Sequence, residues 1–312
     1  MGEFKHISVM PMEVVNYLDV KPDGIYVDGT LGGGGHSSLI LKKLTTGKLI
    51  GVDQDETAIK AATLFLRGHE NFIPIHGSFH DLGELLTKKN ISKIDGVLLD
   101  LGVSSHQIDT PERGFSFRFD GPLDMRMDSK KSLTAADIVN LYDEKEIADI
   151  LFNFGEERYS RKIAREICIR RKEKPFLTTL DLADFIERTS SYSSTKTKNR
   201  IHPATRSFMA LRIAVNDELA PLENAIREII PFLNSSGVFS IITFHSLEDR
   251  IVKKTFKNLE SPCICPRDIP YCVCSNKPSV KVITRKPILP SEEELEFNSR
   301  AHSAKLRIAK KL

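Results

Sequence analysis

Four consecutive glycines, Gly32–Gly35, are the strongest sign of chemistry in this chain. They follow an apolar segment that ends at Asp28, and the next apolar segment along the chain ends at Asp53. Glycines let the backbone turn tightly and lie close to a ligand, because no Cβ stands in the way. A carboxylate at the position of Asp53 can accept hydrogen bonds from the two hydroxyls of a ribose. The sequence therefore predicts a nucleotide-binding site.

The spacing of the glycines limits which nucleotide this site binds. The dinucleotide fingerprint G-x-G-x-x-G needs a third glycine, but counting from Gly32 or Gly33 that place falls on a serine, Ser37 or Ser38. A P-loop needs a lysine directly after its last glycine, and His36 stands there instead. The pattern favours a ligand that carries adenosine but no pyrophosphate. An ordinary tight turn between a strand and a helix is the alternative.

Alternating strand and helix patterns position these residues. Strands are expected at 24–30, 49–53, 72–76 and 95–100, with helices at 37–44, 57–66 and 82–88. Such alternation is typical of a doubly wound parallel sheet, in which ligands bind at the carboxyl ends of the strands. Asp28, Asp53, Phe79 and Asp100 all fall at or just beyond strand ends, so we expect them to line one pocket.

The sheet pattern is interrupted and then resumes. A strand is expected at 237–244, and late strands are expected at 281–285 and 304–308. Between the two halves the pattern is helical from 134 to about 219, with a helix start at Thr134. Phe115, Phe117 and Phe119 alternate just before it; they could stack on a base, but we expect at least two of them in the core.

Positive charge gathers in this helical insertion. Residues 156–175 carry a net charge of +4 and residues 195–212 a net charge of +5, whereas the whole chain carries only +3. A basic surface on an otherwise acidic protein favours a nucleic-acid partner. A solvated helix face is the alternative interpretation.

Composition bounds the class of protein. The chain has 312 residues, of which 40% are hydrophobic and 28% charged, a balance typical of globular domains. No apolar run approaches the roughly 18 residues that a membrane span needs, and the N-terminus lacks the apolar core of a signal peptide. We therefore expect a cytoplasmic protein.

Four of the five cysteines form two C-x-C pairs, Cys263 with Cys265 and Cys272 with Cys274. Four thiols this close could bind zinc, although most structural zinc sites use C-x₂-C spacing. A reduced cysteine hairpin is the alternative, and a permanent disulfide does not fit a cytoplasmic setting. The sequence leaves these possibilities open.

Longer motifs carry a more specific resemblance. They lie at 28–30, 34–37, 100–105, 113–117, 123–128, 155–157, 210–213, 215–219 and 244–250. Over nearly the whole chain these motifs resemble the bacterial RsmH (MraW) family, which methylates N4 of a cytosine in 16S ribosomal RNA with S-adenosylmethionine. The resemblance implies an α/β fold: a class I, Rossmann-like methyltransferase sheet in 1–108 and 219–312, interrupted by an all-helical insertion in 109–218 that recognises the substrate.

The resemblance also implies roles for single residues. By matching motif, the cofactor-binding set is Gly34, Gly35 and His36 around the amino-acid moiety, Asp53 at the ribose, Phe79 at the adenine, and Asp100 and Gln107 at the methyl-donor end. No metal is expected in this site. The implied partner is 16S ribosomal RNA within the small ribosomal subunit, at a cytidine of the decoding region.

Transfer to an exocyclic nitrogen needs no protein nucleophile. It needs an acceptor near N4, and Asp100 is the catalytic candidate, with His245 and Ser246 as second candidates. Three other functions remain open: methylation of another nucleic acid, a non-catalytic ribosome assembly factor, and a nicotinamide enzyme. The absent third glycine counts against the last of these.

Overall fold

The computed structural model describes residues 8–190, 202–266 and 271–312. The chain divides into two compact units. The sheet unit contains Met1–Gly102 and Leu219–Leu312, and the helical unit contains Val103–Glu218. The first boundary thus falls at residue 102, six residues before the boundary at 108 expected from the sequence.

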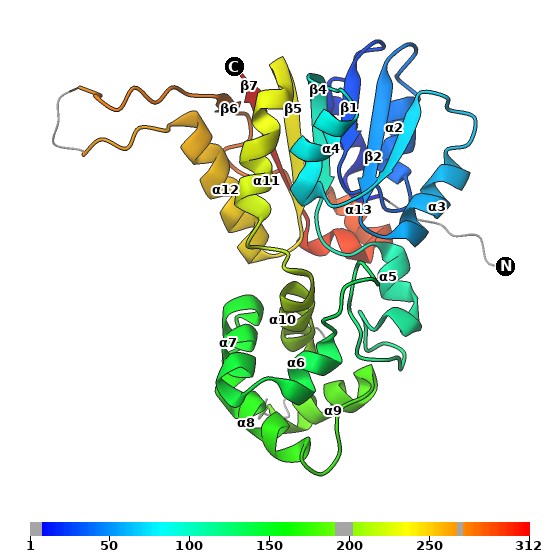
Figure 1. The fold of residues 1–312 in the computed structure, drawn as a ribbon, viewed down its shortest axis with the longest axis vertical. Coiled ribbons are helices and arrows are strands. Elements are labelled where there is room, and N and C mark those ends of the chain that lie inside the picture. Colours follow the sequence, from blue (N-terminus) through cyan, green and yellow to red (C-terminus); the bar gives the residue numbers. More distant parts are fainter. Residues whose placement is uncertain (1–7, 191–201, 267–270) are drawn as a thin grey trace. The chain divides into compact units, whose positions relative to one another are not determined.

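The sheet unit is built on seven strands in the order β3-β2-β1-β4-β5-β7-β6 (Figure 1). They are β1 (Ile25–Asp28), β2 (Lys48–Asp53), β3 (Phe72–His76), β4 (Ile94–Asp100), β5 (Leu233–Thr243), β6 (Val280–Val282) and β7 (Lys305–Lys311). The first five are parallel, whereas β7 runs antiparallel between β5 and β6. The predicted doubly wound sheet is confirmed. Because β1, β2 and β4 are parallel neighbours, their carboxyl ends lie along one edge.

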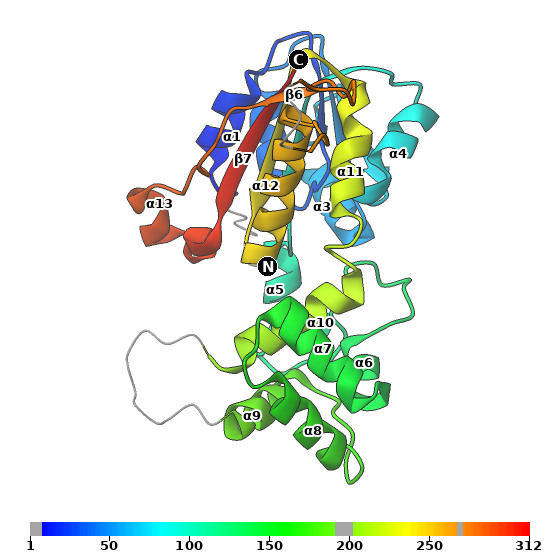
Figure 2. The same cartoon turned by 90° about the vertical axis from the view of Figure 1, so that its left-hand side faces the viewer.

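Helices cover both faces of this sheet (Figures 1 and 2). On one face pack α1 (Pro11–Leu18), α2 (Gly35–Leu41) and α3 (Glu56–Phe65); on the other pack α4 (Leu82–Lys88), α11 (Leu222–Ile229) and α12 (Ser246–Glu260). Within β4, Val97 and Leu99 enter one apolar core and Leu98 the other, because successive side chains of a strand point to opposite faces. Burial on both faces explains the continuous apolar run of this strand.

The last part of the chain completes the sheet unit. The short helix α13 (Glu292–Phe297) precedes β7. Arg307 of β7 is buried and pairs with Asp249 of α12: its Nε lies 2.5 Å from Oδ1 and its Nη2 3.1 Å from Oδ2. This ion pair ties the antiparallel strand to the helix beside it.

The helical unit has a core of its own. Its helices are α5 (Ser105–Asp109), α6 (Ala135–Leu141), α7 (Glu144–Gly155), α8 (Ser160–Arg170), α9 (Thr179–Thr189) and α10 (Ala204–Asn216). Their apolar faces bury Ile138, Leu151, Ile163 and Leu211 together. The helix start predicted at Thr134 is confirmed, since its hydroxyl caps α6 in a capping box. Across the described ranges no helix is both long and apolar enough to cross a membrane.

The three alternating phenylalanines of this unit have different environments. Phe115 and Phe117 pack against the helical core, and the ring of Phe117 lies 4.8 Å from that of Phe208 in an edge-on contact. Phe119 is 60% exposed. The expectation that at least two of them serve the core is confirmed, and only Phe119 of the three presents an open ring.

Candidate active site at the carboxyl edge of the sheet

The glycine loop between β1 and α2 forms the floor of the site. Gly34 has a φ of +80°, a left-handed conformation that residues with a Cβ rarely adopt, and it is the N-cap of α2. At Gly29 a Cβ would lie only 2.5 Å from Cδ2 of Leu99 in β4. These two glycines let the loop turn sharply and lie close against the end of the neighbouring strand.

Asp53 holds this loop from the end of β2. Its Oδ2 accepts a hydrogen bond from the backbone of Gly32 at 2.8 Å, and its Oδ1 accepts one from the backbone of Asp55 at 2.9 Å. Burial raises the pKa of Asp53 to about 6, although both hydrogen bonds act in the opposite direction. Each carboxylate oxygen has a second lone pair, so the group can also accept hydrogen bonds from a ligand.

Asp28 is the buried acid at the end of β1. Its Oδ2 accepts a hydrogen bond from the Ser37 hydroxyl at 2.7 Å, and its Oδ1 accepts one from the backbone of Thr30 at 3.2 Å. Burial raises its pKa to about 6 against these two hydrogen bonds. Asp28 therefore joins the strand, the loop and the first turn of α2.

His36 is buried in α2, and its protonation state follows from its contacts. Its Nε2 lies 2.8 Å from the backbone carbonyl oxygen of Val9, which can only accept, so Nε2 carries the proton. Burial lowers the pKa of His36 to about 4, although this hydrogen bond acts to raise it. The ring is neutral at physiological pH, and its bare Nδ1 lies 3.6 Å from Oδ2 of Asp100.

Asp100 stands at the end of β4 with one oxygen to spare. Its backbone N–H donates to the Thr30 hydroxyl at 2.6 Å, which fixes the strand end against the loop. Within the described residues its Oδ1 is buried and has no hydrogen-bond partner, while the side chain as a whole is 20% exposed. Burial raises the pKa of Asp100 well above its usual value, and repulsion from Asp28 and Glu248 raises it further.

The electrostatics of this edge select the charge of the ligand. Burial raises the pKa values of Asp28, Asp53 and Asp100, and neighbouring acids raise those of Asp53 and Asp100 further. A ligand with positive charge would relieve this repulsion and satisfy the open oxygen of Asp100, whereas phosphates would add to the repulsion. The residues present therefore fit a cationic nucleoside.

Phe79 lies beside the same loop. It begins the short 3₁₀ turn Phe79–Asp81 that follows β3, and it is half-buried against the core of the sheet unit. Its Cβ would lie 3.4 Å from a Cβ placed on Gly29, so the side chain borders the glycine loop. A half-buried aromatic ring in this position can lie against a flat base.

Gln107, the remaining residue of the expected cofactor set, belongs to the helical unit. Its side-chain oxygen accepts a hydrogen bond from the backbone of Ser104 at 3.0 Å, and its backbone donates to the Ser104 hydroxyl at 3.2 Å. This reciprocal pair is a capping box at the start of α5. The other six expected cofactor residues lie in the sheet unit.

His245, a second candidate for proton acceptance, is engaged at the start of α12. Its Nδ1 accepts a hydrogen bond from the backbone of Glu248 at 3.4 Å. Glu248 in turn accepts from the backbone of Phe244 at 2.8 Å. These contacts make His245 the N-cap of a 15-residue helix, which favours a structural role for it over a catalytic one.

Some site residues were missed by the sequence analysis. Thr30 and Ser37 hold Asp100 and Asp28 through their hydroxyls, and their positions around the glycines could have indicated this. The contact of Val9 with His36 could not be predicted from the sequence, because a backbone carbonyl 27 positions away makes it.

Sheets of this strand order carry nucleotides at their carboxyl edge, and the acids at this edge suit a positively charged one. S-Adenosylmethionine is such a nucleoside, since it joins adenosine to a sulfonium and an ammonium group and has no phosphate. The fold and the site thus define the class as an S-adenosylmethionine-dependent methyltransferase. The family described as "MraW methylase family" matches residues 3–312, and the chain belongs to it.

Relatives that share about half of the sequence carry names that agree with this family. The chain is 53% identical to the "Ribosomal RNA small subunit methyltransferase H" of Clostridium botulinum (strain Kyoto / Type A2) over 311 residues, 99% of this chain and 100% of the relative. It is 51% identical to the protein of the same name from Carboxydothermus hydrogenoformans, over 99% of both chains. Among solved structures it is similar to a Streptococcus mutans protein described as "a putative methyltransferase" in complex with SAH, with a TM-score of 0.44, 12% identity and coverage of 98% and 100%. The predicted family is confirmed.

Proposed function

We propose that this enzyme methylates N4 of a cytidine in the decoding region of 16S ribosomal RNA, using S-adenosylmethionine. Its relatives, about half identical over their full length, are by name ribosomal RNA small subunit methyltransferases, and methylation of that RNA is the activity of this chain. One observation carries the choice of Asp100 as the proton acceptor: its Oδ1 is open at the carboxyl edge of the sheet.

Asp100 is the proposed proton acceptor. The lone pair of a cytosine N4 is delocalised into the ring, so the amino group is a weak nucleophile. A carboxylate that accepts a hydrogen bond from N4 localises that lone pair and takes the proton after transfer. The bound cofactor supplies a methyl group on a positively charged sulfur, and that charge would lower the pKa of Asp100 and keep it ionised.

The remaining residues of the site bind and orient. Asp53 would accept hydrogen bonds from the ribose hydroxyls with its free lone pairs, and Phe79 would lie against the adenine. The amino-acid moiety would rest on the loop at Gly34 and Gly35. The assignment of Gln107 to the methyl-donor end rests on the motif resemblance alone. The protein's share of the rate would then come mainly from holding N4 in line with the methyl group at near-attack distance.

The helical unit is the proposed RNA-binding part. Exposed cations follow one another on and around α8: Arg158, Arg161, Arg165 and Lys172. They can contact phosphates of the RNA backbone, which fix position without reading sequence. The exposed ring of Phe119 can stack on a base.

Not every basic residue of this unit is available to RNA. Arg170 pairs with Asp181 at 2.6 Å, and Arg212 binds Glu218 through two hydrogen bonds of 2.8 Å. These arginines stabilise the helical unit itself, so the net charge of the sequence overstates the free positive charge. The basic residues between 195 and 201 lie outside the described residues.

One assay tests this function and its alternatives. The protein is incubated with labelled S-adenosylmethionine and with small subunits that lack the modification, or with naked 16S RNA, and the methyl group is mapped by mass spectrometry. We expect N4-methylcytidine in the decoding region, formed on the small subunits. A methyl group on another RNA position or on DNA would refute the acceptor. Binding of cofactor and subunit with no transfer at all would make the protein an assembly factor.

A further inference from the structure

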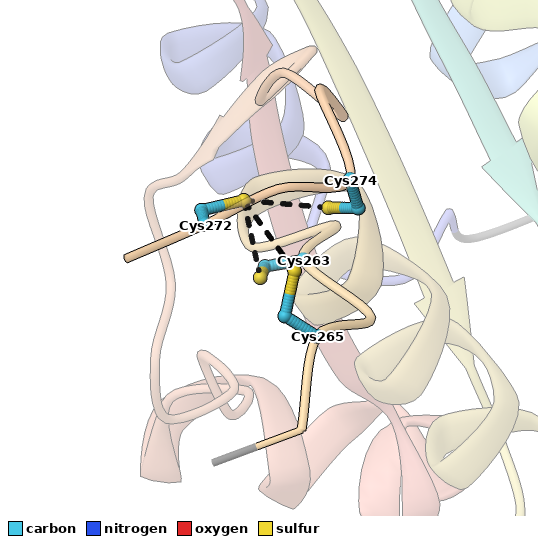
Figure 3. Close-up of side chains that lie close together, drawn as sticks. All are labelled: Cys263, Cys265, Cys272 and Cys274. Carbon is cyan, nitrogen blue, oxygen red and sulfur yellow. Dashed lines mark hydrogen bonds between the residues drawn. The ribbon is translucent and has the colours of Figure 1, made fainter. Parts of the chain in front are cut away.

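Four cysteines outside the methyl-transfer site converge in the segment that connects α12 to β6. Cys263, Cys265, Cys272 and Cys274, the cysteine cluster, are all free thiols. Their sulfurs point toward one another from two stretches of chain that run side by side (Figure 3). The segment is anchored at its base, where Ser279 donates from its backbone to the Leu259 carbonyl at 2.9 Å.

The distances between these sulfurs match one tetrahedral ion. The Sγ of Cys272 lies 3.5 Å from that of Cys263, 3.8 Å from that of Cys265 and 3.4 Å from that of Cys274. All four sulfurs lie within 4.8 Å of one another. Four thiolates around zinc at about 2.3 Å stand about 3.8 Å apart, the edge of that tetrahedron. A disulfide needs about 2 Å, and an iron–sulfur cluster spreads its thiolates around several iron atoms.

We propose that the cysteine cluster is a structural zinc site with four thiolate ligands. The C-x-C spacing suits it, because alternate side chains of an extended stretch lie on one face, so two facing C-x-C stretches present four sulfurs to one point. A knuckle with C-x₂-C spacing reaches the same tetrahedron from two tight turns. Soft thiolates in a tetrahedral arrangement select zinc over the hard cations calcium and magnesium.

Backbone N–H groups already point at the sulfurs. Val273 donates to Sγ of Cys265 at 3.3 Å. The backbones of Ile264 and Asn276 also donate hydrogen bonds to the sulfur of Cys274. Hydrogen bonds of this kind stabilise thiolates and orient the ligands around a metal.

The segment also needs a cross-link, since its apolar side chains face outward. Ile264 is 79% exposed, Tyr271 74% and Val273 64%. These side chains bury little apolar surface within the segment and so cannot hold it together. Asn276 adds one hydrogen bond of 3.1 Å to the Pro262 carbonyl. A bound ion would join the outgoing and returning stretches in the way a small core does elsewhere.

The test is the metal content of the full chain purified under reducing conditions from cells supplied with zinc. Inductively coupled plasma mass spectrometry should find about one zinc ion per chain in the wild type. The double variant Cys265→Ser, Cys274→Ser should lose at least about nine-tenths of it, because two of the four ligands are gone. The matched control Cys168→Ser removes the one cysteine outside the cluster and should keep its zinc.

A second measurement uses the wild type alone and so does not depend on how the variants fold. Cobalt(II) added to the metal-free wild type should give the strong visible absorption and the sulfur-to-metal charge-transfer band of a tetrahedral thiolate site.

Affinity of the double variant for S-adenosylmethionine should stay within about twofold of wild type, because the cluster lies outside the strand-end residues. The proposal is overturned by a wild type without zinc and without the cobalt spectrum, by full retention of zinc in the double variant, or by a disulfide within the cluster.

Discussion

Affinity for S-adenosylmethionine should rise with pH. In the ligand-free protein burial raises the pKa values of Asp28 and Asp53 to about 6, and the pKa of Asp100 is also raised. Their folded pKa values exceed those of the unfolded chain, so these carboxyls stabilise the fold at low pH, and that contribution is lost as the pH rises through about 6. A cationic ligand binds the ionised carboxylates better, so binding must expel protons in the acid range.

The magnitude follows from the titration of one group. A carboxyl with a pKa near 6 is about one-tenth ionised at pH 5 and about nine-tenths ionised at pH 7. If Asp53 must be ionised to hold the ribose, the apparent affinity at pH 5 is about tenfold weaker than at pH 7, or about 1.4 kcal/mol. A second carboxyl that ionises on binding steepens the dependence to as much as about a hundredfold.

Isothermal titration calorimetry measures this directly. Titrations at about pH 5, 6 and 7, each in two buffers of different ionisation enthalpy, give the affinity and the number of protons released. The variant Asp53→Asn should release about one proton fewer at pH 5. The control Asp19→Asn, an exposed acid at the end of α1, should keep the wild-type slope. An affinity that is flat or falls from pH 5 to pH 7 would refute the reasoning.

Three substitutions test the other assignments. Asp53→Ala should weaken cofactor binding by about tenfold or more, because it removes hydrogen bonds to a charged group; unchanged affinity in calorimetry would contradict the ribose assignment. Asp100→Asn should lower the methyl-transfer rate by at least about a hundredfold in the labelled-subunit assay, and near-normal turnover would leave Asp100 a positioning residue. Arg307→Met breaks the buried pair with Asp249 and should cost about 3 kcal/mol of stability in urea unfolding; a midpoint equal to wild type would show that the pair does not hold β7 to α12.

The strand-end acids could be predicted from the sequence for a simple reason. In a parallel sheet neighbouring strands end at the same edge, so apolar runs that each finish in an acid place Asp28, Asp53 and Asp100 together. Local turn chemistry likewise predicted the start of α6 at Thr134. Both inferences rest on short-range sequence patterns, which determine local structure without reference to distant contacts.

Other features depend on contacts that no local pattern encodes. Arg170 meets Asp181 only because α8 and α9 pack together, so counting charges along the sequence could not reveal their pairing. The antiparallel course of β7 follows from its pairing with β5, a contact between segments far apart in the chain. The role of His245 as a helix cap could have been recognised, since Glu248 follows three residues later, but His is not a common N-cap residue.

The contact between His36 and Val9 means that a main-chain atom sets the tautomer of a ring in the active site. No side-chain substitution at Val9 removes that carbonyl from the chain. Displacement of the backbone just before α1 would release it and let the ring turn its N–H toward Asp100. A change that shifts the backbone just before α1 would therefore reach the candidate active site without altering any of its side chains.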